Sequence, residues 1–142
     1  MKIQKASLFA LYAVLELASD PERQLSTTDI ADKYGISTHH LAKVLRTLVR
    51  SKLVQAARGV GGGYRFTGVV NRTTLLDVIE LFETLESELD APNPNEQAGK
   101  AIIEELQSIT SEIDDLTKTV LDTITLETVL SSSRLRAKLF TQ

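Results

Sequence analysis

Hydrophobic residues recur at helical spacing near the start of the chain and predict a first helix. The positions that carry this pattern are Leu8, Leu11, Tyr12, Leu15 and Ala18. Residues three or four apart lie on one face of a helix, so residues 3–18 are expected to pack one apolar side on a core. Pro21 follows soon after and is expected to end the segment, since proline cannot continue a helix.

Two more helices are predicted on either side of Gly35. Ser26, with Asp29 three residues later, is typical of a capping box that begins a helix over residues 27–34. Gly35 suits the left-handed position after that helix, and Ser37 is the expected N-cap of the next. The apolar residues of this third helix share one face: Leu41, Val44, Leu45 and Leu48. The pattern predicts a helix-turn-helix with a polar and basic outer face.

Two short apolar stretches follow and predict a β-hairpin. Residues 54–57 and 64–66 read as strands, joined by the glycine-rich sequence of residues 58–63. A phosphate-binding loop is the rival interpretation of these glycines. A Walker loop needs Gly-Lys-Ser/Thr and a dinucleotide fingerprint needs a following helix, whereas Tyr64-Arg65-Phe66 alternates like a strand. A helix-turn-helix followed by a two-stranded β-wing is therefore the favoured interpretation.

The second half of the chain is predicted to hold three further helices separated by an acidic linker. Thr73 or Thr74 is expected to cap a helix over residues 75–85. From Asp77 to Glu96 there are seven acids and no base, ending in turn signals. We interpret residues 85–97 as a solvated linker loop. A divalent metal loop is the less favoured alternative, because the acids lack calcium-loop spacing.

A long helix is predicted over residues 96–122, with a narrow apolar stripe. Its members step by 4, 3, 4, 3 and 4 residues and form what we call the apolar seam: Ile102, Leu106, Ile109, Ile113, Leu116 and Val120. Such spacing favours pairing with a second helix, here that of a second copy of the chain. Packing only within its own subunit is the alternative. A short helix over residues 126–130 and a loosely held tail, residues 131–142, carrying Arg134, Arg136 and Lys138, are expected to follow.

The expected fold class is therefore mainly α. Residues 1–84 are expected to form a winged helix-turn-helix DNA-binding domain with a two-stranded β-wing. Residues 85–97 are the expected acidic linker, and residues 98–142 the expected long C-terminal dimerisation helix with a short helix and tail. The chain has 142 residues and no cysteine, which excludes disulfides, thiol catalysis and thiolate-held clusters or zinc. No apolar run approaches the ~18 residues of a membrane helix, so a cytoplasmic protein without membrane contact is expected.

Charge divides the chain into two unlike halves. Residues 1–72 hold eleven bases and five acids, whereas residues 73–142 hold five bases and 14 acids. Between Asp32 and Asp77 there are eight bases and no acid. This asymmetry indicates a polyanion-binding first half, despite the net charge of -3.

The third helix and the wing carry the candidate DNA contacts. Candidates for base recognition lie at the front of the helix: Ser37, Thr38, His39, His40 and Lys43. Arg46 and Arg50 lie further along and suit phosphates. The wing candidates are Arg58, Gly61, Gly62, Gly63, Tyr64 and Arg65, since glycines permit close approach and arginine is attracted to the minor groove. A merely solvated basic helix face is the alternative. The two histidines point about 100° apart on a helix, which disfavours a shared metal ion.

The order of these segments resembles the Rrf-two family of bacterial winged-helix transcription regulators. The residues that carry the resemblance are MKIQKASLFALYAVLELA, IADKYGISTHHLAKVLRTLVRSKLV, RGVGGGYRF and TTLLDVIELFE. The resemblance implies reader positions at Ser37, His39, His40 and Lys43, with Arg58 in the minor groove and Gly61 to Tyr64 as the wing. The chain departs from the family at Ala6-Ser7, where Lys-Gly is common. Cluster-binding members carry three cysteines in the linker, so this cysteine-free chain is expected to hold no cofactor and no iron-sulfur cluster.

The expected function is a homodimeric, sequence-specific DNA-binding transcription regulator that acts as a repressor on a pseudo-palindromic operator. The alternative is a winged-helix adaptor that docks protein partners through its acidic C-terminal half. An enzyme is not expected, because no nucleophile, base and orienting group can be assembled from the sequence. A small-molecule effector, a protein effector and no effector all remain open.

Overall fold

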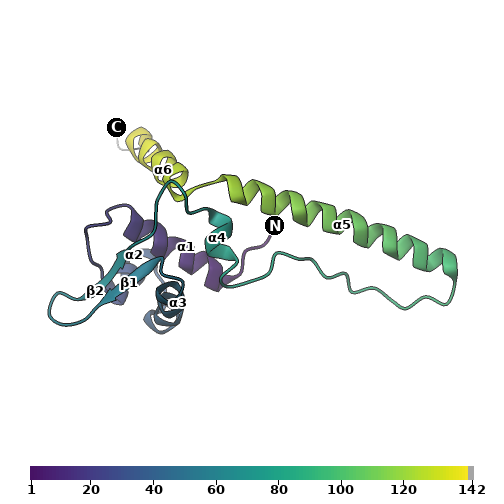
Figure 1. The fold of residues 1–142 in the computed structure, drawn as a ribbon, viewed down its shortest axis with the longest axis horizontal. Helices are drawn as coiled ribbons and strands as arrows, with labels where there is room; N and C mark the ends of the chain where they lie inside the picture. The colour runs from purple at the N-terminus through teal and green to yellow at the C-terminus, as the bar shows by residue number, and fades with distance from the viewer. Residues whose placement is uncertain (141–142) are drawn as a thin grey trace.

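The structure, a computed structural model, describes residues 1–140 as a small helical body with one long helix projecting from it (Figure 1). The helices are α1 (Lys5–Ala18), α2 (Thr27–Tyr34), α3 (Thr38–Arg50), α4 (Leu75–Ile79), α5 (Gln97–Thr123) and α6 (Leu126–Phe140). The strands β1 (Val54–Ala57) and β2 (Gly63–Phe66) pair antiparallel, with Val54 opposite Phe66 and Ala57 opposite Gly63. The mainly helical fold class, with its two-stranded wing and long C-terminal helix, is confirmed.

Capping interactions determine where the two helices of the helix-turn-helix begin and end. The Ser26 hydroxyl accepts from the Asp29 backbone N–H, and the Asp29 carboxylate accepts from the Ser26 N–H, each at 3.0 Å. Gly35 adopts the left-handed conformation at φ 65° and ends α2. Ile36 is buried in the turn, and Ser37 caps α3 as the sequence predicts. These contacts fix the angle at which α3 leaves α2, and so the direction of its exposed face.

The core is built around α1. This helix packs against α2, α3, α4, β2 and α6, which explains why most of it is buried. The side chains with no exposed surface come from several elements: Ala10, Ala13, Val14, Leu17, Ile30, Leu41, Leu45, Leu48, Val78, Ile79 and Leu126. Burying a leucine or isoleucine side chain stabilises a fold by about 1.5–3 kcal/mol. This cluster therefore holds α3 and the wing on one rigid support.

The helix predicted over residues 75–85 is shorter than expected and ends at Ile79. Thr74 caps it, through a capping box with Asp77. Beyond it the chain turns toward the start of α1, where the Glu83 carboxylate accepts hydrogen bonds from the Gln4 backbone N–H and the Ser7 hydroxyl. These contacts join residues nearly eighty positions apart, so helical periodicity could not reveal where the helix stops.

The predicted short helix over residues 126–130 and the loosely held tail after it are wrong for residues 131–140. Helix α6 continues to Phe140, while residues 141–142 lie outside the described part of the chain. Leu126 and Leu130 are buried and anchor the first turns, and no glycine or proline interrupts the residues that follow. Three successive serines favoured a break, but the good helix formers after them allow the helix to continue.

Helix α5 projects from the body, and the linker that precedes it runs alongside it from the body to its far end (Figure 1). The linker is fastened midway, where the Ser87 backbone N–H and hydroxyl donate to the Asp114 carboxylate at 2.7 and 2.8 Å. Leu121 is the buried residue of α5. None of the helices described in residues 1–140 is long and apolar enough to cross a bilayer.

Candidate nucleic-acid interface

Helix α3 separates an apolar inner face from a polar outer face. Leu41, Val44, Leu45 and Leu48 are buried against the core. The opposite face is exposed at Thr38, His39, Lys43, Arg46 and Arg50. A helix with this division can present its outer side to the major groove without disturbing the fold.

The two histidines at the front of α3 have different environments. His39 is exposed, whereas His40 is half-buried with its ring edge against Phe9, at a centroid distance of 4.9 Å and 71° between planes. His40 therefore has less freedom to reach a base than His39. The Ser37 hydroxyl accepts from the His40 backbone N–H at 3.3 Å, which leaves its own proton available to a DNA acceptor.

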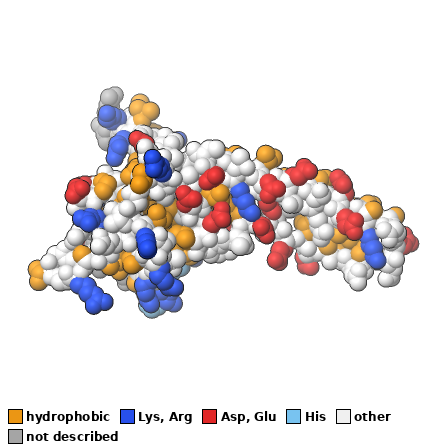
Figure 2. Space-filling view, viewed as in Figure 1, with side chains coloured by type: hydrophobic (Ala, Val, Ile, Leu, Met, Phe, Trp, Pro, Cys, Tyr) orange, Lys and Arg blue, Asp and Glu red, His pale blue; other side chains and the backbone are white. Residues whose placement is uncertain are grey.

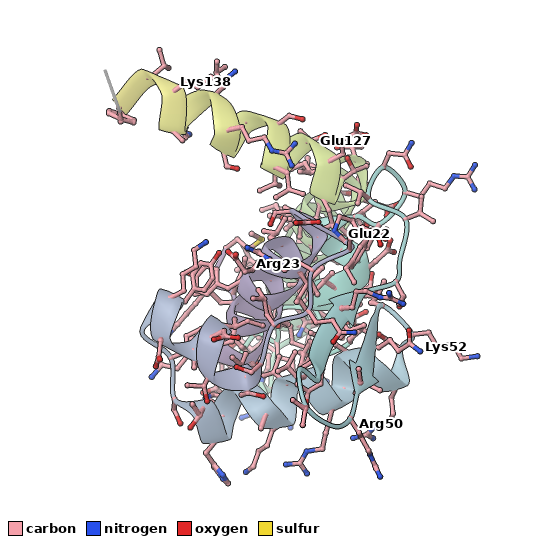
Figure 3. The ribbon with its side chains drawn as sticks, turned by 90° about the vertical axis from the view of Figure 1, so that its left-hand side faces the viewer. Glu22, Arg23, Arg50, Lys52, Glu127 and Lys138 are labelled. Atoms are coloured by element: carbon pink, nitrogen blue, oxygen red, sulfur yellow. The ribbon has the colours of Figure 1, made fainter. Side chains whose placement is uncertain are left out.

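Lys52 is a candidate contact that sequence reasoning missed. It lies in the turn between α3 and β1, is exposed, and has a φ of 68°, which is unusual for a residue other than glycine. The turn is fastened by the Thr67 hydroxyl, which donates to the Lys52 carbonyl at 3.0 Å. Figure 3 shows Lys52 and Arg50 pointing outward from the end of α3 and the turn after it. The signal in the sequence is a base two residues after Arg50, the last residue of α3.

The wing is fixed to the body by a contact that the sequence does not reveal. Leu25 and Tyr64 exchange backbone hydrogen bonds of 2.7 and 3.0 Å, which adds a short antiparallel bridge beside β2. Gly63 makes this approach possible, because a Cβ there would lie 2.6 Å from the Leu25 carbonyl oxygen. At the wing tip, Gly61 has a φ of 77°. The two glycines thus have different roles: Gly63 permits a close backbone approach, and Gly61 adopts the left-handed conformation of the turn.

The wing arginines differ in freedom. Arg58 is exposed where β1 ends, whereas Arg65 is half-buried on β2 and donates to the Gln55 side-chain carbonyl at 3.3 Å. Gln55 lies directly opposite it in the strand register. Gly62 and Tyr64 are half-buried, and Val60 at the tip is fully exposed. Arg58 is therefore the wing residue best placed to reach a groove.

Basic and acidic side chains lie on different parts of the molecule. Figure 2 shows Lys and Arg side chains gathered over α3 and the wing, and Asp and Glu side chains spread along α5. Figure 1 places α3 and the wing at the same lower end of the body. The structure thus brings the predicted contacts of residues 37–50 and 58–65 to one end, away from the acidic arm.

An ionic network centred on Glu16 of α1 positions α2 against α1. The Glu16 carboxylate accepts from the Tyr34 hydroxyl at 2.6 Å, and it pairs with Arg23 and Lys33 at 2.9 Å each. Burial raises the pKa of Glu16, but the hydrogen bonds from Tyr34, Lys33 and Arg23 outweigh it, so that the pKa lies below its ordinary value. Glu16 is therefore ionised at neutral pH and holds the helix-turn-helix in place.

The apolar seam of α5 is exposed along its whole length in this single chain. The exposed fractions are 65% for Ile102, 53% for Leu106, 45% for Ile109, 56% for Ile113, 66% for Leu116 and 57% for Val120. The linker covers other positions of the helix and leaves the seam open. Six large apolar side chains in one row are uncommon on the surface of a protein that acts alone.

Sequence comparison places the chain among transcription regulators. Residues 3–132 match the model of the Rrf2 family, described as an iron-dependent transcriptional regulator. The chain is 47% identical over 131 residues to the HTH-type transcriptional regulator BadM of Rhodopseudomonas palustris, covering 92% of this chain and 81% of that protein.

Solved structures of the same fold cover nearly the whole chain. CymR, the global cysteine regulator of B. subtilis, has a TM-score of 0.72 and 28% identity, covering 93% of this chain and 98% of CymR. IscR of T. potens has a TM-score of 0.66 and 23% identity, covering 94% of this chain and 88% of IscR, and supports the fold alone.

The family description mentions iron, but the side chains described in residues 1–140 do not fit an iron site. The sequence has no cysteine to supply the thiolates of an iron-sulfur cluster. Within residues 1–140, no three His, Asp or Glu side chains come together as ligands of an ion.

Proposed function

This chain belongs to the Rrf2 family of DNA-binding transcription regulators, and from that premise we propose that it is a homodimeric repressor of a pseudo-palindromic operator. It would act in the cytoplasm and without an iron-sulfur cluster. A dimer that occupies its operator excludes other proteins from the same DNA, which is why repression is the proposed outcome.

Base recognition is assigned to the front of α3. Lys43 is exposed and can donate to guanine acceptors in the major groove, while Thr38, His39 and the Ser37 hydroxyl offer further donors and acceptors. His40 is included in this set, with its ring steadied by Phe9. Arg46, Arg50 and Lys52 continue along the same side and are assigned to phosphates, contacts that position the protein without reading the base sequence.

The wing is assigned to the minor groove. Arg58 stands free beside glycines that allow the backbone to approach closely, and a narrow minor groove attracts arginine. Gly61, Gly62 and Gly63 shape the turn, and Tyr64 and Arg65 support it from β2. The Leu25 bridge holds the wing at a fixed angle to α3, so both elements can contact one duplex together.

The second copy is assigned to the apolar seam of α5. Pairing with an identical helix best explains a row of six exposed apolar residues at coiled-coil spacing. Two copies related by a twofold axis present two α3 helices, and half-sites are then expected about one DNA turn apart, roughly 34–36 Å.

The observation that carries the proposal is the exposed basic face of α3 beside a wing with a free arginine. The test is fluorescence anisotropy with a duplex found by footprinting of genomic DNA. We expect Lys43→Ala and Arg58→Ala each to weaken binding by about 1–3 kcal/mol. Affinity should also fall steeply with salt, because phosphate contacts release counterions.

The matched control is Lys100→Ala, which removes an exposed base near the far end of α5. This variant should bind like the unaltered protein. Wild-type affinity of both Lys43→Ala and Arg58→Ala would overturn the assignment of the interface.

A further inference from the structure

A cavity of about 430 Å³ lies between the helix-turn-helix and α6. Its walls come from α1, the segment after α1, α2 and α6. Leu15, Val129 and Leu130 supply apolar surface. This volume is within the range of about 300–1,000 Å³ that is usual for small-molecule sites. Figure 3 shows Arg23, one of its lining residues, beneath α6.

Cations outnumber anions in the lining of this cavity. Arg23, Lys33 and Arg134 line it, and Glu16 is the acid among the lining residues. Arg23 and Lys33 already share the Glu16 carboxylate, at 2.9 Å each. Arg134 comes from α6, and its hydrogen bond goes to the Ser19 carbonyl at 3.5 Å, the long limit of such a contact. One guanidinium is thus left without a carboxylate partner in the described chain.

Aromatic rings form one side of the same cavity. Tyr12 and Tyr34 stack with centroids 5.1 Å apart and planes within 7° of parallel. The Tyr34 hydroxyl donates to Glu16, and burial together with that bond raises the pKa of Tyr34. The Tyr12 hydroxyl has no hydrogen-bond partner within residues 1–140 and remains available to a ligand.

We propose that this cavity binds a small organic monocarboxylate with an apolar body. The Arg134 guanidinium would hold the carboxylate, since its planar fork matches two oxygens. The stacked tyrosines and the α6 side chains Val129 and Leu130 would cover the apolar body. One uncommitted cation matches a single negative charge, which favours a carboxylate over a doubly charged phosphate.

The position of the cavity makes the ligand a candidate effector. A molecule seated there contacts α6 and α2 together, and α2 fixes the angle of α3. This consequence rests on the proposed function, whereas binding of the carboxylate does not. Ligand binding is measured without DNA, so a failure to bind the carboxylate is distinguishable from a failure of the proposed function.

The experiment is calorimetric titration of the full chain with acetate, butyrate, hexanoate and inorganic phosphate. We expect affinity to rise by at least threefold from acetate to butyrate and again to hexanoate, because each step buries more apolar surface. Phosphate should bind at least tenfold more weakly than hexanoate. Equal affinity for acetate and hexanoate, binding of phosphate alone, or no binding of any of them would overturn the proposal.

Two variants on the same helix locate the site. Arg134→Gln should weaken hexanoate binding at least tenfold. Arg136→Gln makes the same change of charge two residues away, at an exposed position that does not line the cavity, and should leave binding unchanged. Circular dichroism checks that both variants are folded. Equal losses in the two variants, or none in Arg134→Gln, would overturn the assignment.

Discussion

Lys52 combines an unfavourable backbone conformation with a position beside the reader helix. A left-handed conformation costs a residue other than glycine or asparagine about 1–2 kcal/mol, while glycine adopts it freely. We expect Lys52→Gly to leave the free energy of unfolding unchanged or raise it by up to about 1 kcal/mol, and yet to weaken DNA binding through loss of a phosphate contact. Urea denaturation and anisotropy measure the two effects separately.

Lys52→Asn is the companion variant, since asparagine tolerates the same conformation and restores a side chain without the charge. It should be as stable as Lys52→Gly and equally weak on DNA. Full DNA affinity in both variants would show that this lysine does not contact the duplex.

Glu16 makes stability depend on pH. The pKa of Glu16 is lowered in the folded state. Its ionised form therefore contributes its full stabilisation above the ordinary carboxyl pKa of about 4.5, and this stabilisation is lost as the pH falls through the lowered pKa. We expect Glu16→Gln to reduce the free energy of unfolding by about 1–2 kcal/mol at pH 7, since its partners Arg23 and Lys33 are partly exposed and screened.

The difference between Glu16→Gln and the unaltered protein should shrink toward zero as the pH falls through the lowered pKa of Glu16, because the carboxyl then becomes protonated in the folded state. Denaturation curves of both proteins from pH 7 to pH 3 measure it. A difference that is constant across this range would contradict an ionic role for Glu16.

Single residues could be predicted from sequence where the chemistry is local. Ser26, Ser37 and Gly35 were correctly assigned to helix ends because their partners lie within a few positions. The partners of Glu16 were not predictable, since Tyr34 is eighteen residues away and meets it only after α1 and α2 have packed. The half-buried state of His40 depends in the same way on Phe9, a residue of another helix.

The bounds of helices and strands can be predicted from sequence where local capping residues or apolar spacing determine their ends. α2 and β1 match their expected ranges, and α3 begins after its expected cap. α4 and α6 do not match their expected ranges. The segment after α4 turns away so that Glu83 meets the distant Gln4 and Ser7, and α6 continues through three serines that local propensity disfavours. The wing was predicted as a hairpin, but its bridge to Leu25 was not.

The wing can pack against Leu25 only because residue 63 is a glycine. A methyl group there would meet the Leu25 carbonyl at 2.6 Å, and this backbone contact cannot move aside as a side-chain end could. We expect Gly63→Ala to lower the free energy of unfolding by about 1–3 kcal/mol by overpacking. Urea denaturation measures the change.

Val60→Ala is the control within the same wing, because Val60 is fully exposed at the tip and its truncation should change stability by less than about 0.5 kcal/mol. If Gly63→Ala were as stable as Val60→Ala, the bridge to Leu25 would not constrain the wing.

At the scale of the whole molecule, the two halves of the chain have complementary charge and complementary roles. The basic end over α3 and the wing is suited to DNA, and the acidic α5 arm projects away from it (Figure 2). Acids along the arm repel phosphates, so the duplex is directed to the winged end. The sequence predicted this division from charge alone, but the linker's attachment to α5 through Ser87 and Asp114 required the folded chain.

The apolar seam of α5 is expected to hold two copies of the chain together. Ile109 lies at the middle of the seam and is 45% exposed in the single chain. An aspartate there would be buried without a partner in a paired helix, at a cost that a two-and-a-half-heptad contact could not offset. We expect Ile109→Asp to sediment as a monomer under conditions where the unaltered protein is a dimer. Its affinity for a full operator should fall to that for a half-site.

Ser108→Asp separates the effect of the seam from that of added charge. Ser108 is the neighbouring exposed residue on α5, and it points away from both the seam and the linker by its place in the heptad. This variant should remain a dimer with full operator affinity, because its new carboxylate stays in water. If both variants remained dimeric, the seam would not be the interface, and the two α3 helices would have to be spaced by another surface.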